Sequence, residues 1–400
     1  MPFPATRADA LSRLDAFMPR AGRAYAARRN FDEGPGGPAG YGRSAVSELS
    51  PAIRRRLVSE EEVARAAATA HGLDAAEKFI QEVCWRSYWR GWLEARPTVW
   101  HRYRADVERL EQQLAANTGL AKAYADAISG RTGIDCFDFW IGELAETGYL
   151  HNHARMSFAS IWIFTLRLPW QLGAAHFFRH LLDACPASNT LGWRWVAGLQ
   201  TAGKTYLASA ETIRRTSGGR FTVSAPLATS AIAPPAEPPV HPAALASLRP
   251  AHADSRTGLW LHSEDLSPET MAWPVAMRAI AAVDAIGGDP ADSKRAHANA
   301  ALADGLARAK SHWQCPATRI PEDDMESAMQ GWAEANRLAQ IVTPYAAVGP
   351  VADRVAAVGV SLAKVGVSLV QQRRDWDSAA WPHATRGFFQ FKSHIPRLLA

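Results

Sequence analysis

The first half of the chain shows apolar positions three and four residues apart, the spacing of amphipathic helices. Alternating runs of β-branched residues are scarce there, and Ser59 followed by three glutamates is typical of a helix N-cap. Residues 149–178 are apolar on nearly every face, as expected of helices buried in a large bundle. We therefore predict a mainly α-helical domain over residues 1–222. Its clearest helical segments are 7–17, 59–71, 75–94 and 120–129.

The pattern changes twice further along the chain. Seven of the 25 prolines fall between residues 223 and 255, which predicts an extended linker. Beyond it, short apolar strand candidates alternate with helical patterns, and this alternation favours a parallel, Rossmann-like α/β domain over residues 256–400. The strand candidates are 259–261, 338–342 and 367–370, and the helical segments between them are 291–311 and 351–364. The predicted fold class is thus mainly α, a large helical bundle plus a C-terminal α/β domain.

Composition narrows the function classes only slightly. The 400 residues are 48% hydrophobic, enough for two or three folded domains. No signal peptide and no membrane-spanning apolar run is evident, so we expect a cytoplasmic protein without a membrane partner. The four cysteines lie far apart, which disfavours a disulfide framework, a zinc site or an iron–sulfur cluster. The net charge of +5 comes mainly from arginines before residue 220 and is compatible with a phosphate-bearing partner or cofactor.

Two segments early in the helical domain contain candidate ligand-binding residues. Residues 46–51 place small hydroxyl side chains before a helix start, where they could face a phosphate or simply cap the helix. In residues 79–89, Glu82, Trp85 and Arg86 share one helix face with Trp89. A carboxylate, a flat aromatic ring and a guanidinium on one stripe could bind a stacked heterocycle, although a tryptophan stripe is more often part of a core.

Two later segments place polar residues in an otherwise apolar bundle. Burying them is costly, so residues 147–156 and 181–195 predict either a bound polar ligand or a polar cluster that holds helices together. Asp183 is the expected ion-pair partner of Arg155. The spacing of His151 and His153 directs them to different faces, so we expect no metal site.

Together these segments resemble the FAD-binding catalytic domain of the DNA photolyase/cryptochrome family, over about residues 10–215. The motifs follow in order as S-x-L-S-P, E-x-x-W-R, T-G-Y-L-H-N-x-x-R-M and L-D-x-x-x-A-S-N-x-x-G-W-x-W. The resemblance implies an FAD molecule in the helical bundle, with Asn189 facing flavin N5 and Cys185 where the family usually has a second acidic residue. The implied FAD-binding residues are Tyr25, Ser47, Leu49, Ser50, Phe79, Arg86, Tyr149, Asn152, Arg155, Asp183, Cys185, Asn189 and Trp193.

The activity implied by the resemblance is light-dependent repair of cyclobutane pyrimidine dimers, in which reduced FAD passes an electron to damaged DNA. The implied dimer-binding residues are Glu82, Trp85, Asn152, Met156 and Trp195, and the implied catalytic residues are Glu82, Trp193, Trp170 and Asn189. Trp193 would be the electron donor beside the flavin, with Trp170 one step further out. The alternative is a cryptochrome-like blue-light photoreceptor without repair activity, and a third reading is a flavin-binding structural protein. Cys185 and His153 stand in place of the family's usual residues and favour the photoreceptor.

Two further departures from the family bear on the expectations. The outermost tryptophan of the family's electron-transfer chain would fall near Asn117, and its replacements could include Trp89, Trp92, Trp140 or Trp162. The family's α/β antenna domain normally comes first, whereas here residues 258–266, 345–350, 366–370 and 387–392 resemble it, which implies a relocated antenna domain. A second chromophore could lie against Trp376, Trp381, Phe388 and Phe389, although a core or domain-interface role for these side chains is favoured.

Overall fold

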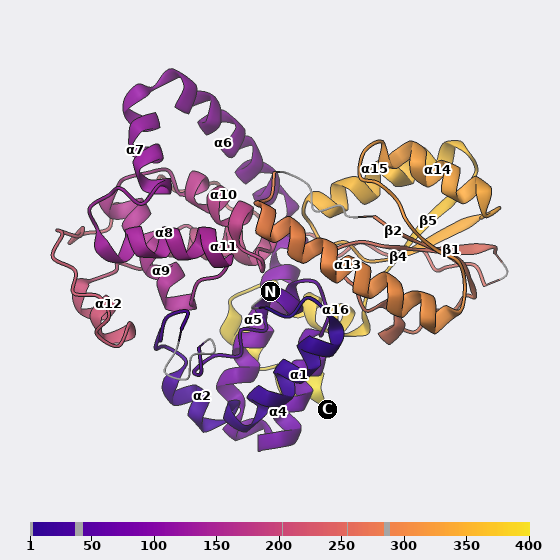
Figure 1. The fold of residues 1–400 in the computed structure, drawn as a ribbon, viewed down its shortest axis with the longest axis horizontal. Helices are drawn as coiled ribbons and strands as arrows, with labels where there is room; N and C mark the ends of the chain where they lie inside the picture. Colours follow the sequence, from indigo (N-terminus) through magenta and orange to yellow (C-terminus); the bar gives the residue numbers. More distant parts are fainter. Residues whose placement is uncertain (1–2, 37–42, 202, 254, 284–288) are drawn as a thin grey trace.

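The structure is a computed structural model that describes residues 3–36, 43–201, 203–253, 255–283 and 289–400. It has a helical part and an α/β part side by side, and the end of the chain returns to the helical part (Figure 1). This arrangement confirms the predicted mainly α fold class with a C-terminal α/β region. None of the described helices has both the length and the apolar character needed to cross a bilayer.

The helical part contains the segments that the apolar spacing predicts. Ser59 caps its helix as expected: its hydroxyl accepts from the Glu62 N–H, and the Glu62 carboxylate accepts from the Ser59 N–H. The helices are α1 (Arg7–Phe17), η1 (Met18–Arg20), α2 (Arg23–Arg28), α3 (Ser50–Arg54), α4 (Glu60–Ala75), α5 (Glu77–Glu94), α6 (Pro97–Ala116), α7 (Thr118–Ile128), α8 (Asp135–Thr147), α9 (Asn152–Ser160), the π-helical turn η2 (Ile161–Thr165), α10 (Trp170–His180), α11 (Pro186–Val196) and α12 (Ala210–Thr216).

The α/β part has a sheet of five parallel strands in the order β3-β2-β1-β4-β5. Its side chains alternate between two faces: Leu259 and Leu261 share a core with α13, whereas Trp260 packs with α14 and α15. Its elements are β1 (Thr257–Leu261), η3 (Pro268–Thr270), β2 (Met277–Ala282), α13 (Asp292–Trp313), β3 (Ala317–Arg319), α14 (Met325–Ala335), β4 (Gln340–Pro344), α15 (Pro350–Lys364) and β5 (Ser368–Gln372). The sequence pattern did not predict β2, β3 and α14.

The predicted linker lies along the helical part without regular secondary structure in its described residues, 223–253 and 255. The carbonyl of Val240 accepts from Arg96, and the Ala243 N–H donates to the Ala95 carbonyl. Arg194 also pairs with Glu237 at 2.6 Å. These contacts hold the segment as a strap across the ends of α5 and α11.

The last residues leave the sheet and pack on α4 and α5. Trp376, Trp381 and Phe388 are buried in the core shared with these helices, whereas Phe389 is 87% exposed. For the three buried rings this is the role that the sequence favoured over a chromophore site, whereas for Phe389 a core role is wrong. The elements are α16 (Asp375–Ala380), η4 (Trp381–His383), α17 (Phe388–Lys392) and α18 (Ile395–Leu399).

Buried ion pairs fix the helical part against the sheet. Arg54 pairs with Glu264 at 2.6 Å, and Arg56 pairs with Asp377 at 2.7 Å and with Asp265 at 3.3 Å. Burial alone would raise the pKa of Asp265, but the neighbouring Arg374 and Arg56 guanidiniums outweigh it and hold this pKa below its usual range. Both arginines lie on or directly after α3, so the network sets the position of the short helix that begins at Ser50.

Candidate functional site

One cavity of about 480 Å³ opens within the helical part, among α3, α5, α9, α10 and α11. The structure brings nearly all of the predicted site residues to it, and only Cys185 and Trp170 lie outside its lining. The predicted residues that line it are Tyr25, Ser47, Leu49, Ser50, Phe79, Glu82, Trp85, Arg86, Tyr149, Asn152, Arg155, Met156, Asp183, Asn189, Trp193 and Trp195. Motifs distant in the sequence thus converge on one concave surface.

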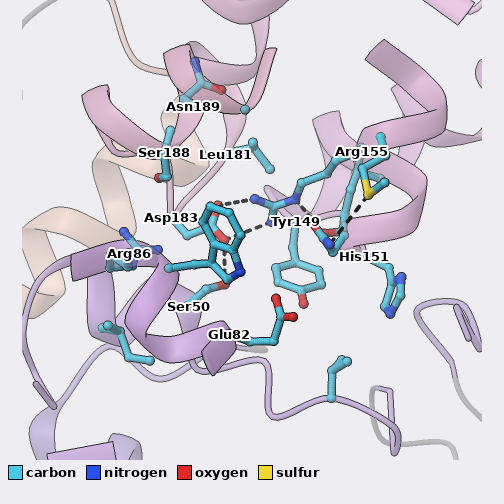
Figure 2. Close-up of a pocket in the computed structure, with 18 of the residues that line it drawn as sticks. Ser50, Glu82, Arg86, Tyr149, His151, Arg155, Leu181, Asp183, Ser188 and Asn189 are labelled. Atoms are coloured by element: carbon cyan, nitrogen blue, oxygen red, sulfur yellow. Dashed lines mark hydrogen bonds and ion pairs between the residues drawn. The ribbon is translucent and has the colours of Figure 1, made fainter. Parts of the chain in front are cut away.

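The predicted Arg155–Asp183 ion pair is present at the centre of this cavity (Figure 2). Two guanidinium nitrogens of Arg155 donate to the two Asp183 oxygens at 3.0 and 2.9 Å, and Arg155 Nε donates to the Leu150 carbonyl. Ser50 Oγ donates to Asp183 Oδ2 at 2.5 Å. Burial would raise the pKa of Asp183, but Arg155 outweighs it and keeps the carboxyl ionised. The cavity therefore contains a fixed pair of opposite charges, and the Ser50 hydroxyl is engaged with it.

Aromatic side chains form another part of the wall. Tyr149 is buried between two guanidiniums, Arg43 at 5.1 Å and Arg155 at 5.2 Å from its ring centroid. Tyr25 packs edge-on against Phe79 with centroids 5.0 Å apart. Burial raises the pKa of both tyrosines, so both phenols are neutral at physiological pH. This wall is apolar, with hydroxyl groups that can form hydrogen bonds without adding charge.

The predicted stripe on α5 faces the cavity. Glu82 pairs with Arg29 at 2.5 Å, and burial raises the pKa of Glu82 against the opposing effect of this guanidinium. Trp85 lies flat on Phe388 from α17. Arg86 Nη1 is buried and has no hydrogen-bond partner among the described residues. Because leaving such a donor unpaired is costly, Arg86 is a candidate to bind a ligand group in the cavity.

The sequence analysis did not assign Arg29 or Phe388 to the site. Arg29 follows Tyr25 by four residues, so both lie on one helix face, and this spacing could have indicated the contact. Phe388 is distant in the sequence and has no local signal. The predicted dimer-binding residues Asn152 and Met156 lie one helical turn apart, with the Asn152 amide nitrogen 3.8 Å from the Met156 sulfur. Trp195 is 37% exposed and therefore accessible to a large ligand.

Two of the predicted site residues, Cys185 and Trp170, lie outside the cavity lining. Cys185 is buried at the N-cap of α11, in a small space lined by Arg90 and Glu264. Burial would raise the pKa of its thiol, but nearby arginines, Arg86 foremost, lower it. Trp170 is buried at the start of α10 and stacks on Tyr103 with centroids 5.6 Å apart. Cys185, which the resemblance places among the FAD-binding residues, therefore does not line the cavity. The expected place of Trp170, one step further out than Trp193, does not require it to line the cavity.

Asn189 and Trp193 both line the cavity from α11. The Asn189 amide nitrogen donates to the Ala174 carbonyl at 2.8 Å, which fixes the orientation of this side chain. The Trp193 indole is 3% exposed and forms part of the cavity wall. Within the described ranges, no three metal-ligating side chains gather into a cluster.

Part of the chain is similar to known proteins. Residues 79–217 match the FAD binding domain of DNA photolyase. Over 158 residues the chain is 35% identical to a deoxyribodipyrimidine photo-lyase of Streptomyces griseus, covering 39% of this chain and 33% of the relative. A photo-lyase of Synechococcus sp. is 32% identical over 199 residues, covering 47% of this chain and 38% of the relative. The matched segment thus spans between 33% and 38% of the length of these two curated relatives.

Solved structures are also similar in part. A class III photolyase from Agrobacterium tumefaciens aligns with a TM-score of 0.43 and 26% identity, covering 53% of this chain and 43% of its own. The sequence matches identify residues 79–217 as similar to the FAD-binding domain of DNA photolyases. FAD is the cofactor of this domain.

The cavity fits such a cofactor. Its volume lies in the range of about 300–1,000 Å³ typical of pockets for small molecules and cofactors. The unpaired, buried Arg86 Nη1 offers a donor to an FAD oxygen, and the Arg155–Asp183 pair offers a fixed donor and acceptor at the centre. We expect these three residues to hold the FAD, together with the apolar wall of Tyr25, Phe79 and Tyr149.

Proposed function

We propose that this protein splits cyclobutane pyrimidine dimers in DNA, driven by blue or near-UV light and with reduced FAD as electron donor. The observation that carries the proposal is the continuity of one cavity. The Arg155–Asp183 pair lines the same space as the predicted dimer-binding residues, of which Asn152 and Trp195 are exposed and Glu82, Trp85 and Met156 are half-buried. Bound FAD supplies light absorption and one-electron transfer, and the protein supplies burial, orientation and charge.

The predicted dimer-binding residues that line the cavity suit a flipped pyrimidine dimer. Trp85 and Trp195 present flat rings, and stacking on such rings stabilises an extruded base. A dimer is poorly stacked in its duplex, so its extrusion is less costly than that of an intact base. The Glu82 carboxylate can accept a hydrogen bond from a base N–H, and its pairing with Arg29 directs the carboxylate.

The test is a repair assay on the purified, flavin-loaded protein under reducing conditions. The substrate is an oligothymidylate that contains dimers, and the readout is recovery of thymine absorbance under illumination, with a dark control. Glu82→Gln should lower the repair rate without changing the flavin spectrum. Glu108→Gln, at a side chain 66% exposed on α6, is the matched control and should repair like wild type. If illuminated wild-type protein repairs nothing, the proposal is wrong and the photoreceptor alternative is favoured.

A further inference from the structure

A line of ring contacts runs from the cavity wall toward the surface. The Trp193 ring meets the Trp162 ring edge to face, with centroids 6.2 Å apart and planes at 86°. Trp162 in turn meets Tyr124 with centroids 6.0 Å apart and planes at 85°. Trp162 is fully buried, whereas Tyr124 on α7 is only half-buried. Three oxidisable rings therefore connect the cavity to a position that solvent can reach.

The packing around these rings fixes their spacing. A Cβ atom on Gly173 would lie 2.3 Å from Trp193 Cη2 and 3.0 Å from Trp162 Cε2, so only a glycine lets both indoles approach here. Trp162 lies in the π-helical turn η2, where the Leu166 N–H donates to the Ile161 carbonyl at 2.9 Å. π-helical turns are frequent at functional sites. The indole Nε1–H of Trp162 donates to the Pro169 carbonyl at 2.9 Å, which orients the ring.

Two other candidate tryptophans, Trp170 and Trp140, make no ring contact with Trp193 among the described residues. In the described part of the chain, Trp170 makes its ring contact with Tyr103 and none with Trp193. Trp140 contacts Phe221, also away from Trp193. Because electron transfer between rings slows steeply with distance, direct contact favours Trp162 as the donor to Trp193.

We propose that Trp162 and Tyr124 form an electron relay to Trp193. The relay would serve in place of Trp170 and of the outer tryptophan expected near Asn117, and it rests on the proposed flavin photochemistry. Trp193 gives one electron to photoexcited, oxidised FAD, and Trp162 then gives one electron to the Trp193 radical cation. Tyr124 gives one electron to oxidised Trp162 and releases its phenolic proton to water, which leaves a neutral tyrosyl radical. An external thiol donates the hydrogen atom that restores Tyr124.

The protonation of the Tyr124 phenol agrees with its release of a proton on oxidation. Burial, and secondarily the carboxylate of Glu111, raise the pKa of its phenol. The phenol therefore keeps its proton at neutral pH, and its oxidation must release that proton. Its partial exposure lets water accept the proton and lets a thiol approach the radical.

The experiment uses the full-length, FAD-loaded protein with oxidised flavin and a thiol reductant. Transient absorption follows the tryptophan and tyrosyl radicals, and continuous illumination follows flavin reduction. Trp162→Phe should abolish both the tyrosyl radical and lasting photoreduction, while flavin stays bound. Tyr124→Phe, a mild change at a partly exposed ring, should abolish the tyrosyl radical and leave a tryptophan radical that recombines. Trp140→Phe is the control for loss of a buried indole and should behave like wild type.

Trp170→Phe tests the rival exit. The relay predicts that this variant still forms the tyrosyl radical. Loss of that radical in Trp170→Phe, or its persistence in Tyr124→Phe, would overturn the relay. Wild-type flavin reduced chemically with dithionite needs no relay, so a failed repair assay on that material rejects the proposed repair function and not the relay.

Discussion

Trp85 and Phe388 lie face to face, with ring centroids 3.7 Å apart and planes 11° from parallel. Trp85 belongs to α5 and lines the cavity, whereas Phe388 begins α17 near the end of the chain. The Tyr88 hydroxyl also donates to the Arg386 carbonyl at 2.7 Å, next to this stack. The C-terminal segment therefore supports the ring that we expect to stack on an extruded base.

Phe388→Ala should consequently weaken both the fold and substrate binding. Removing a buried phenylalanine typically costs about 3–5 kcal/mol in unfolding free energy, and it frees Trp85 to adopt other orientations. We expect a lower midpoint in urea unfolding and weaker binding of dimer-containing DNA. Phe389→Ala is the matched control, because its side chain is 87% exposed, and it should change neither quantity. Equal effects of the two variants would contradict a supporting role of Phe388.

Asp183→Asn should release the flavin. The substitution keeps the shape of the side chain but removes the charge that compensates Arg155, and breaking a buried ion pair costs about 3 kcal/mol or more. We expect loss of bound FAD, measured by absorbance after gel filtration, and a lower unfolding midpoint. Asp289→Asn is the control, since Asp289 pairs with Arg179 at 2.9 Å but is 74% exposed; such surface pairs contribute at most about 1 kcal/mol. Retention of FAD by Asp183→Asn would show that this carboxylate is dispensable for binding.

Local spacing explains which parts of the site could be predicted from the sequence. Glu82, Trp85 and Arg86 recur at helical spacing, so their shared face on α5 follows from the sequence alone. The Arg155–Asp183 pair follows from opposite charges in apolar surroundings. Phe388 could not be found in this way, because its contact depends on how the end of the chain packs.

Two strands of the sheet, like Phe388, could not be predicted from local sequence. β1 and β4 were recognisable as short apolar runs, but β2 reads Met-Arg-Ala-Ile-Ala-Ala and β3 has only three residues. Alanine favours helices over strands, so neither segment carries a strand signal of its own. Their parallel pairing with neighbouring strands, rather than local preference, makes them extended.

Gly173→Ala should disturb the contact between Trp193 and Trp162. The added methyl group would meet both indoles at less than van der Waals distance, and overpacking of this kind costs about 1–3 kcal/mol. We expect a lower unfolding midpoint and a changed tryptophan emission spectrum. Gly142→Ala is the matched helical control: its site on α8 is open, so the better helix propensity should stabilise the protein by up to about 1 kcal/mol. A stable Gly173→Ala protein with unchanged emission would contradict the packing described for these rings.

The buried, neutral ring of His151 should make the unfolding free energy fall in mild acid. It caps α9: its Nδ1 accepts from the His153 N–H, and its Nε2 lies 3.1 Å from the Arg29 carbonyl, an arrangement that suits the neutral ring. Burial lowers the pKa of His151 to about 4; Asp32 opposes this effect, and Arg43 adds to it. The unfolded chain, with a histidine pKa near 6.5, therefore binds more protons than the folded chain between pH 6.5 and about 4. The contribution of the neutral His151 ring to the unfolding free energy is complete above this pH window. It falls as the pH drops through the window, by at most about 1.4 kcal/mol per pH unit.

The measurement is urea unfolding at pH 7 and pH 5. His151→Asn keeps a side chain that can cap the helix and removes the titration, so its unfolding free energy should fall less between the two pH values than that of wild type. A residual slope remains, because burial also lowers the pKa of His297 to about 4. His101→Asn, at an exposed position of α6, should retain the wild-type slope. If His151→Asn and wild type lose stability equally, proton uptake by this ring on unfolding is not the cause of the acid sensitivity, and the neutral cap at the edge of the cavity is wrongly assigned.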